Sequence, residues 1–332
     1  MSQTMPLTSR SCGGAVAVAL LCIVLIAALA GCSTADGGTP PGGHRSADLP
    51  PTDPTVRLTG ATPAEGAPER IIALDRAGSI SRMVWALGLG DRLVGRDTAT
   101  DFPGAADLPQ ITPGGHAVNA EAVLALQPDL ILTDGSIGPS RVLQTIADAG
   151  VEVIEIPGER TPANIRQLAV AVADAVGLDG RGEEVGDAIG AELDEATDRA
   201  HERADGRRMI VLYLRGTSIA MIGGPESGAG ELIERLGGVD AAADLGIEGS
   251  FTSLTPEALA KAAPDTVIVM SHGLDSIGGP EGLNSLPGMP NTPAGANGSV
   301  LDVPDSQLLS FGPDTPRVLA AMADALYGRA GA

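Results

Sequence analysis

Aromatic residues are scarce in this chain of 332 residues, which has one tryptophan, two tyrosines and three phenylalanines. A binding site that relies on ring stacking therefore has few rings available. Lysine occurs once, and 21 basic residues stand against 42 acidic ones, which gives a formal net charge of -21. A chain with this balance is not expected to bind nucleic acid by neutralising phosphates, or anionic lipid through a polybasic patch.

Cysteine is confined to the N-terminus, at Cys12, Cys22 and Cys32. Residues 14–31 are almost wholly apolar, follow Arg10 and end in Leu-Ala-Gly before Cys32. This pattern is typical of a secretory signal peptide over residues 1–31. Residues 29–32, Leu-Ala-Gly-Cys, resemble the lipobox of bacterial lipoproteins. This resemblance implies that the chain is cleaved before Cys32 and that Cys32 carries a lipid anchor on the extracytoplasmic face of the cell membrane. A single transmembrane anchor is the alternative, because the run is long enough to span a bilayer.

Residues 32–69 are rich in proline and glycine and show no apolar periodicity. This composition predicts a flexible tether in which His44 is exposed to solvent. Cleavage before Cys32 would leave one cysteine, so the sequence predicts neither a disulfide nor a thiolate metal site.

The remainder of the chain repeats itself. An apolar run at 70–74 is followed by a glycine and a helical pattern, and a similar beginning recurs at 208–213. Residues 121–132 align with residues 257–268 at a constant offset of 136, and each copy predicts a short helix, a Pro-Asp break and a buried strand. This spacing is the size of a domain, which indicates two Rossmann-like α/β lobes.

We expect the lobes at residues 70–178 and 206–332, joined by one charged helix within residues 179–205. Two α/β lobes, one long helix and a lipobox resemble a substrate-binding protein of an ABC importer of the helical-backbone class. The resemblance implies a ligand cleft between the lobes, and a permease with its ATPase as partners.

Candidate ligand-binding residues lie in loops that follow strands, where open α/β sheets bind ligands. His116 lies in a glycine-flanked loop of the first lobe, and Tyr213 lies near the end of an apolar strand of the second. Tyr213 and Arg215 share one face of that strand. The guanidinium favours the phenolate, a hard anionic oxygen donor suited to ferric iron. His272 is the alternative ligand from the second lobe.

Histidine and tyrosine are known axial ligands of haem iron. The ordered segments that carry a closer resemblance are 115–121, 213–216, 223–229, 273–279, 286–295 and 311–313. Together they resemble haemin-binding lipoproteins of haem importers. The resemblance implies that haem b is the transported ligand, taken up free or from a haem-donating protein. It also implies that His116 and Tyr213 bind the iron and that Arg215 is hydrogen-bonded to Tyr213.

The glycine-rich stretch 223–230 lacks the Lys-Ser or Lys-Thr pair of a phosphate loop, so we do not expect a nucleotide site. Its backbone amides, with Ser227 and Gly228, are instead candidates for binding a haem propionate. Two positions depart from the haemin-binding pattern: Val118 and Asp314 stand where arginine is common in the family. We expect Asp314 to place a negative charge near the cleft.

Glu121 and Glu257 occupy matching places in the two repeats, each in the first turn of a predicted helix. Helix capping is one explanation. The resemblance implies another, in which each lobe presents one glutamate to arginines of the permease.

No arrangement of nucleophile, base and oxyanion donors is visible in the sequence, so we do not expect an enzyme. Within the binding proteins, a ferric-siderophore or cobalamin carrier is the alternative cargo class. A surface lipoprotein without a transport role is the alternative outside that class.

Overall fold

The structure is a computed structural model that describes Met1, residues 42–113, Gly115 and residues 117–329. Residues 40–332 form one compact unit that contains both sheets and all three apolar cores. The signal peptide candidate, Cys32 and His116 lie outside the described residues. None of the helices in the described part of the chain is long and apolar enough to cross a membrane.

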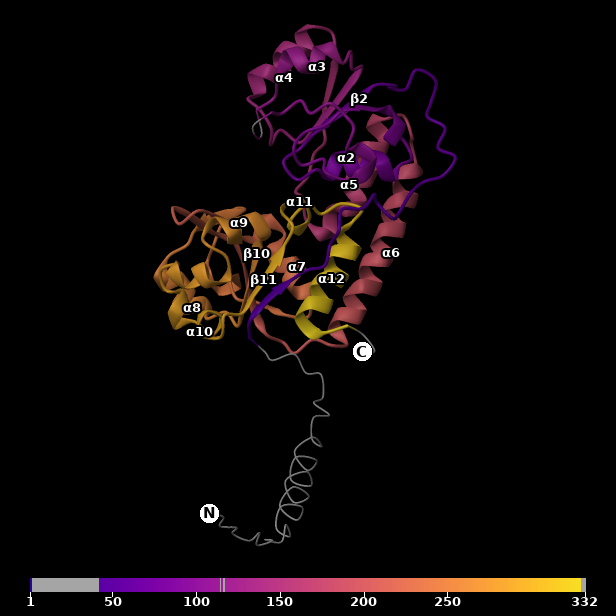
Figure 1. The fold of residues 1–332 in the computed structure, drawn as a ribbon. Coiled ribbons are helices and arrows are strands. Elements are labelled where there is room, and N and C mark those ends of the chain that lie inside the picture. The colour runs from indigo at the N-terminus through magenta and orange to yellow at the C-terminus, as the bar shows by residue number, and fades with distance from the viewer. Residues whose placement is uncertain (2–41, 114, 116, 330–332) are drawn as a thin grey trace. The chain divides into compact units, whose positions relative to one another are not determined.

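The first lobe is built on a four-stranded parallel sheet with the order β3-β2-β4-β5. All four residues of β2 and all four of β4 are buried, as expected for central strands covered on both faces. The helices that cover them are labelled in Figure 1. The elements are β2 (Ile71–Leu74), α2 (Ser79–Ala86), β3 (Leu93–Gly95), α3 (Ala120–Ala125), β4 (Leu130–Thr133), α4 (Ser140–Asp148), β5 (Glu152–Glu155) and α5 (Ile165–Ala175).

The second lobe contains a seven-stranded mixed sheet with the order β1-β11-β10-β6-β7-β9, in which β8 also pairs with β6. Its strands are β1 (His44–Ser46), β6 (Arg208–Arg215), β7 (Ile219–Gly223), β8 (Val239–Asp240), β9 (Phe251–Ser253), β10 (Thr266–Met270) and β11 (Val300–Val303). Its helices are α7 (Ala229–Arg235), α8 (Pro256–Ala262), α9 (Ser271–Ser276), α10 (Pro293–Asn297), α11 (Asp305–Leu308) and α12 (Thr315–Tyr327).

The two repeats share backbone details at the offset of 136. Asn119 caps α3 by accepting from the amide of Ala122, and Thr255 caps α8 by accepting from the amide of Ala258. Each helix is followed by a non-glycine residue with positive φ, namely Gln127 at 47° and Ala263 at 43°. The structure therefore supports a duplication of one α/β unit.

The repeats also start their central strands in the same way. The carboxylate of Asp129 accepts from the amide of Arg70, and that of Asp265 accepts from the amide of Arg208. Each arginine side chain also donates to carbonyls at the end of a helix that comes later in the chain. Arg70 donates to those of Leu126 and Gln127 after α3, and Arg208 to that of Ala262 in α8. These contacts tie α3 to the start of β2 and α8 to the start of β6.

Helix α6 (Arg181–His201) connects the lobes and packs against α5 and α12, as Figure 1 shows. Its buried residues include Val185, Ile189, Leu193 and Ala196, which recur at helical spacing and belong to the largest apolar core. A Cβ on Gly186 would lie 2.8 Å from Cγ of Arg166, so glycine permits close packing on α5. The prediction of two α/β lobes joined by one long helix is confirmed.

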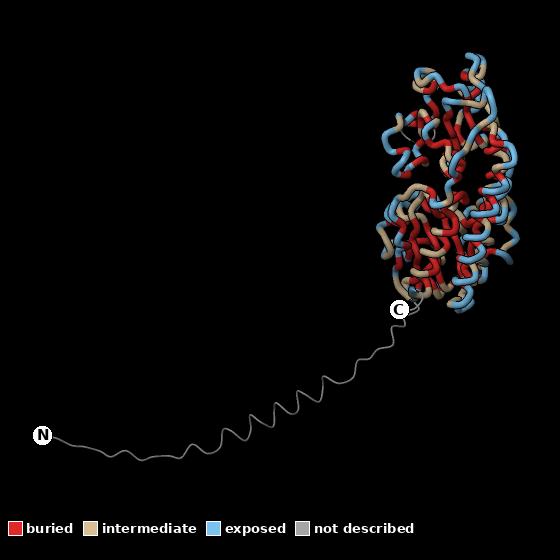
Figure 2. Tube along the Cα trace, turned by 90° about the vertical axis from the view of Figure 1, so that its right-hand side faces the viewer, coloured by how far each residue is buried: buried red, intermediate tan, exposed pale blue. Residues whose placement is uncertain are grey.

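Residues 42–69 differ from the expected flexible tether. β1 runs parallel to β11 at the edge of the second sheet, and His44 Nε2 lies 2.7 Å from Asp302 Oδ1. Leu49 and Leu58 are buried in the largest core. Figure 2 shows the buried residues in red inside the folded body and the exposed ones in pale blue on its outside. The expectation of a tether is wrong for this part of the chain, because an extended segment without periodicity can still pair with a sheet edge. His44 contacts Asp302 from this strand and is exposed, as the sequence predicted.

A buried ion pair joins the two lobes. Arg82 on α2 donates from Nη1 to Asp314 Oδ2 at 2.5 Å, and both side chains are only 2% exposed. The other terminal nitrogen of Arg82 binds Asp101 at 2.6 Å, and Asp101 accepts a hydrogen bond from Ser306 of the second lobe. Burial raises the pKa of Asp314, while the charge of Arg82 opposes that rise. The expectation that Asp314 places a negative charge near the cleft is wrong, because its carboxylate is buried against a cation.

We expect Asp314→Asn to destabilise residues 33–332 by about 3–5 kcal/mol, because it leaves the buried Arg82 without its closest counter-charge. Denaturant unfolding measures this change in the free energy of unfolding. Asp187→Asn is the matched control: it breaks an exposed pair with Arg166, which we expect to contribute little to stability because solvent screens it. Equal effects of the two substitutions would contradict the structural role of the buried pair.

Candidate functional site

Tyr213 and Arg215 lie together at the carboxyl end of β6. The Nε of Arg215 donates to the hydroxyl oxygen of Tyr213 at 3.0 Å, and its Cζ lies 5.3 Å from the centre of the tyrosine ring. Phe251 of β9 contacts the same ring, with 5.9 Å between the ring centroids. Tyr213 is half-buried and Arg215 is exposed. The phenol oxygen is thus held in place by a hydrogen bond from a cationic side chain.

Asp305 extends this cluster and is a residue that the sequence did not indicate. Its Oδ1 lies 3.7 Å from Nη1 of Arg215, and its Oδ2 accepts from the backbone amide of His272 at 3.0 Å. The Nδ1 of His272 lies 3.4 Å from the same oxygen. Since Asp305 comes shortly after β11, its place beyond the end of a strand was the signal that could have identified it.

Asp305 connects His272 to Tyr213 and Arg215, because it contacts both His272 and Arg215. The side chain of His272 is 80% exposed. The structure therefore brings together Tyr213, Arg215 and His272, all named from the sequence. Tyr213 is the member that the guanidinium of Arg215 contacts directly.

The loops around His116 meet the carboxyl end of the first sheet. Gly115 accepts from the hydroxyl of Thr98, and Ala117 forms a parallel bridge with Gly138 in the loop after β4. The amide of Val118 donates to the carbonyl of Gly138, and the Val118 side chain is buried in the core of the first lobe. Burial explains this departure from the family pattern, since an arginine would have to place its charge in an apolar core.

The carboxyl end of the first sheet faces the second lobe. Ser79, at the start of α2, lies beside Gly312, where a Cβ on the glycine would be 3.5 Å from Cβ of Ser79. Asp101 accepts from Ser306, the neighbour of Asp305. The loops that follow β2 and β3 therefore approach the same segment of the second lobe that contacts Arg215.

Ser227 and Gly228 are placed differently from the expectation. The hydroxyl of Ser227 donates to the carbonyl of Gly224 at 2.6 Å and accepts from the amide of Ala229, and Ser227 is buried. Gly228 packs against the ring of Phe311, because a Cβ there would lie 2.5 Å from a ring carbon. These contacts are internal to the second lobe, and they give both residues a structural role that the sequence did not predict.

Glu121 and Glu257 are exposed in the first turns of α3 and α8. The caps of these helices are supplied by Asn119 and Thr255 instead. Capping by side-chain hydrogen bonding therefore does not account for the two glutamates.

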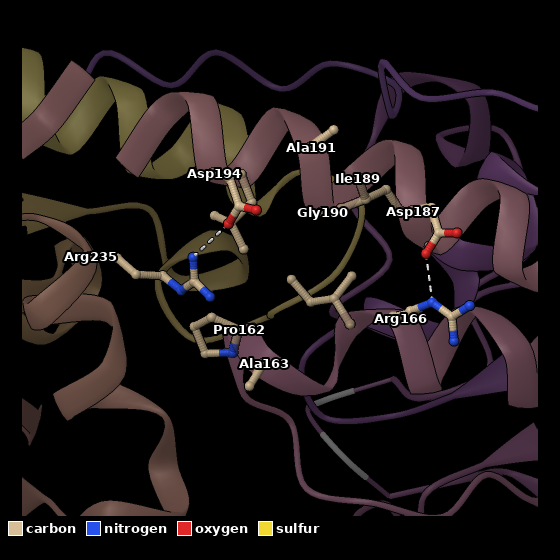
Figure 3. A pocket seen from close by; sticks show the side chains of 12 residues that line it. Pro162, Ala163, Arg166, Asp187, Ile189, Gly190, Ala191, Asp194 and Arg235 are labelled. Carbon is tan, nitrogen blue, oxygen red and sulfur yellow. Dashed lines mark hydrogen bonds and ion pairs between the residues drawn. The ribbon is translucent and has the colours of Figure 1, made fainter. Parts of the chain in front are cut away.

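Figure 3 shows a groove of about 400 Å³ at the junction of α5, α6 and α7. Two ion pairs line it, Arg166 with Asp187 at 2.6 Å and Arg235 with Asp194 at 3.5 Å. It lies along the linking helix and does not include Tyr213 or the loops of the first sheet. Over the described residues, no group of three or more histidine, cysteine, aspartate or glutamate side chains is placed to hold a metal ion.

A model of the family described as periplasmic binding protein matches residues 71–307. The chain belongs to this family. The family is one of binding proteins, so the prediction that the chain is not an enzyme is confirmed, as is its resemblance to the helical-backbone class.

Solved structures and curated sequences point to two cargo classes. The chain is similar to the heme binding protein HmuT, with 37% identity, coverage of 88% of this chain and 100% of the other, and a TM-score of 0.79. It is also similar to the periplasmic heme-binding protein RhuT from Roseiflexus sp. RS-1, with 34% identity, coverage of 78% and 98%, and a TM-score of 0.71. A cobalamin-binding protein of Halobacterium salinarum is 29% identical over 324 residues, covering 92% of this chain and 84% of that protein.

This periplasmic binding protein carries a pair of buried carboxylates behind the candidate site. Asp75 follows β2, and its Oδ2 accepts from the amide and the hydroxyl of Ser79. The Oδ2 of Asp97 accepts from the amide of Asp75, and both aspartates are fully buried. Burial raises the pKa of Asp75 to about 7, and the nearby charges of Asp97 and Asp134 add to the rise. Burial likewise raises the pKa of Asp97 to about 6.

These raised pKa values predict that the periplasmic binding protein loses stability as the pH rises from about 4 to about 7. The folded state holds protons on Asp75 and Asp97 that the unfolded state has already released, because the ordinary pKa of aspartate is about 3.9. We expect Asp75→Asn to flatten this dependence, as measured by urea unfolding at several pH values. Asp205→Asn is the control, since an arginine hydrogen bond lowers the pKa of Asp205. A slope unchanged in Asp75→Asn would refute the assignment.

Proposed function

We propose that this protein binds haem b between its lobes and delivers it to the permease of an ABC importer. The hydrogen bond of Arg215 to Tyr213 at the carboxyl end of β6 carries the proposal, because it prepares a phenol oxygen for ferric iron. The similarity to solved heme-binding proteins over 88% of the chain supports it. His116 is the proposed iron ligand from the first lobe. His272 is the alternative to Tyr213.

Cobalamin is the second candidate cargo, because the curated relative that covers 92% of the chain is a cobalamin-binding protein. The two cargoes differ in charge: haem carries two free carboxylates, whereas the side chains of the cobalamin ring are neutral amides. A ferric siderophore is a third candidate cargo. A surface role without transport is the candidate from outside the class of cargo carriers.

We expect residues 33–332 to bind haemin with a shift of its Soret band, and to bind cyanocobalamin far more weakly. Tyr213→Phe and His116→Ala remove proposed iron ligands, so each is expected to change the Soret and visible bands of the complex. Absorption titration measures both.

Tyr327→Phe is the matched control, because the hydroxyl of the chain's other tyrosine donates to the carbonyl of Leu236. A haemin spectrum unchanged by the protein would refute haem binding. A spectral change in His272→Ala but not in Tyr213→Phe would assign the second ligand to His272. Tight binding of cyanocobalamin instead would establish cobalamin as the cargo.

Glu121 and Glu257 are the proposed docking residues for the permease, one on each lobe. We expect Glu121→Ala combined with Glu257→Ala to abolish stimulation of the importer's ATPase while leaving the haemin titration unchanged. The reason is that both carboxylates are exposed and neither supplies the cap of its helix. Glu192→Ala, an exposed glutamate on α6, controls for the loss of negative charge. Loss of haemin affinity in the double variant would contradict the docking role.

The proposed location is the extracytoplasmic face of the cell membrane, with a lipid anchor at Cys32. The family supports the extracytoplasmic location. The anchor and the signal peptide stay predictions from the sequence.

A further inference from the structure

Arg76 is an exposed arginine shortly after β2, a central strand of the first sheet. Its backbone amide donates to the hydroxyl of Ser136 at 2.9 Å, and its Nη2 donates to the carbonyl of Ser136 at 2.9 Å. Among the residues that the structure describes, Nε and Nη1 of Arg76 have no hydrogen-bond partner. The protein therefore fixes the guanidinium through one N–H group of Nη2 and leaves the N–H groups of Nε and Nη1 able to donate to a ligand.

The loop that fixes Arg76 is the loop that contacts the neighbours of His116. Ser136 lies two residues before Gly138, which bridges Ala117 and accepts from the amide of Val118. The loop after β4 therefore contacts Arg76 through Ser136, and Ala117 and Val118 through Gly138.

This edge of the first lobe is turned toward the Tyr213 cluster. Asp75, the residue before Arg76, binds Ser79, which packs on Gly312 of the second lobe. The neighbouring loop reaches the second lobe through Asp101 and Ser306. Arg76 therefore follows a strand end whose neighbouring residues, Ser79 and Asp101, contact the second lobe.

The charged side chains near the carboxyl ends of β4 and β5 include two acidic ones. Asp134 hydrogen-bonds to Ser136, and Glu155 lies at the end of β5 beside Gly135, where a Cβ would be 3.5 Å from Oε1 of the glutamate. In the second lobe, Arg215 is already engaged by Tyr213 and Asp305. Since the two charged groups named from the first lobe are both acidic, a cargo with two carboxylates would gain from a positive charge at this edge.

We infer that Arg76 binds a carboxylate of the cargo through the N–H groups of its guanidinium that the protein leaves without a partner. The inference rests on the proposed function. Val118 and Asp314 stand where arginine is common in the family, and Arg76, shortly after β2, supplies the positive charge that these two residues lack. An arginine already held by Ser136 suits this role, because its guanidinium forms charge-assisted hydrogen bonds to a carboxylate and loses little freedom on binding.

The test compares haemin with haemin dimethyl ester, which has the same iron and ring but no free carboxylates. We expect Arg76→Gln to raise the Kd for haemin about 10-fold or more, because a hydrogen bond to a charged partner is lost. The Kd of the same variant for the dimethyl ester should stay within about twofold of wild type. Absorption titration of residues 33–332 provides both values, and binding of the ester shows that the variant is folded.

Arg70→Gln is the matched control. Arg70 is also exposed and also donates to backbone carbonyls, but it lies at the amino end of β2, at the opposite edge of the sheet. An equal loss of haemin affinity in Arg70→Gln would show that the effect comes from the loss of one positive charge anywhere on the lobe, and it would overturn the inference. Equal losses for haemin and its ester in Arg76→Gln would overturn it as well. An unchanged haemin Kd in Arg76→Gln refutes the inference alone, whereas failure of the wild type to bind haemin refutes the proposed function.

Discussion

The arrangement of the lobes depends on the buried pair of Arg82 and Asp314. Two charges are costly to remove from water, and their attraction repays that cost only where the geometry is good. Here the guanidinium binds Asp314 of the second lobe and Asp101 of its own, so any opening at this point would separate these charges. Helix α6 acts in the same direction, because its apolar residues belong to a core that includes buried residues of both lobes. Under the proposed function, the cargo binds between surfaces that are already formed, which reduces the entropy lost on binding.

The sequence predicted the parts of the fold that repeat. The offset of 136 identified matched helices and strands, because a duplicated unit keeps its caps and its Pro-Asp breaks. Residues 44–58 were missed, since their order comes from pairing with β11 and from burial, neither of which leaves a periodic pattern. The prediction for Asp314 was wrong for a similar reason. Its partner, Arg82, is 232 residues away, and no local pattern relates the two.

The residues of the candidate site also fall into two groups: those that local sequence pattern relates, and those that only the fold brings together. Tyr213 and Arg215 could be paired from the sequence because alternation along one strand places them on one face. Asp305 could not, because it joins the site through a loop that only the fold brings to β6. The role of the glycine-rich stretch was also a matter of tertiary packing: Phe311 lies against Gly228, which no spacing along the chain indicates.

The scarcity of aromatic and basic residues explains why so few side chains are candidates. Trp85 and Phe102 pack on each other in the first lobe, and the hydroxyl of Tyr327 is used by a backbone carbonyl. Among the three aromatic side chains that remain, only Tyr213 combines partial exposure with a bound guanidinium. The same reasoning applies to charge. In a protein with a net charge of -21, an anionic cargo of the kind proposed depends on the few arginines, such as Arg76, whose guanidinium keeps N–H groups without a partner.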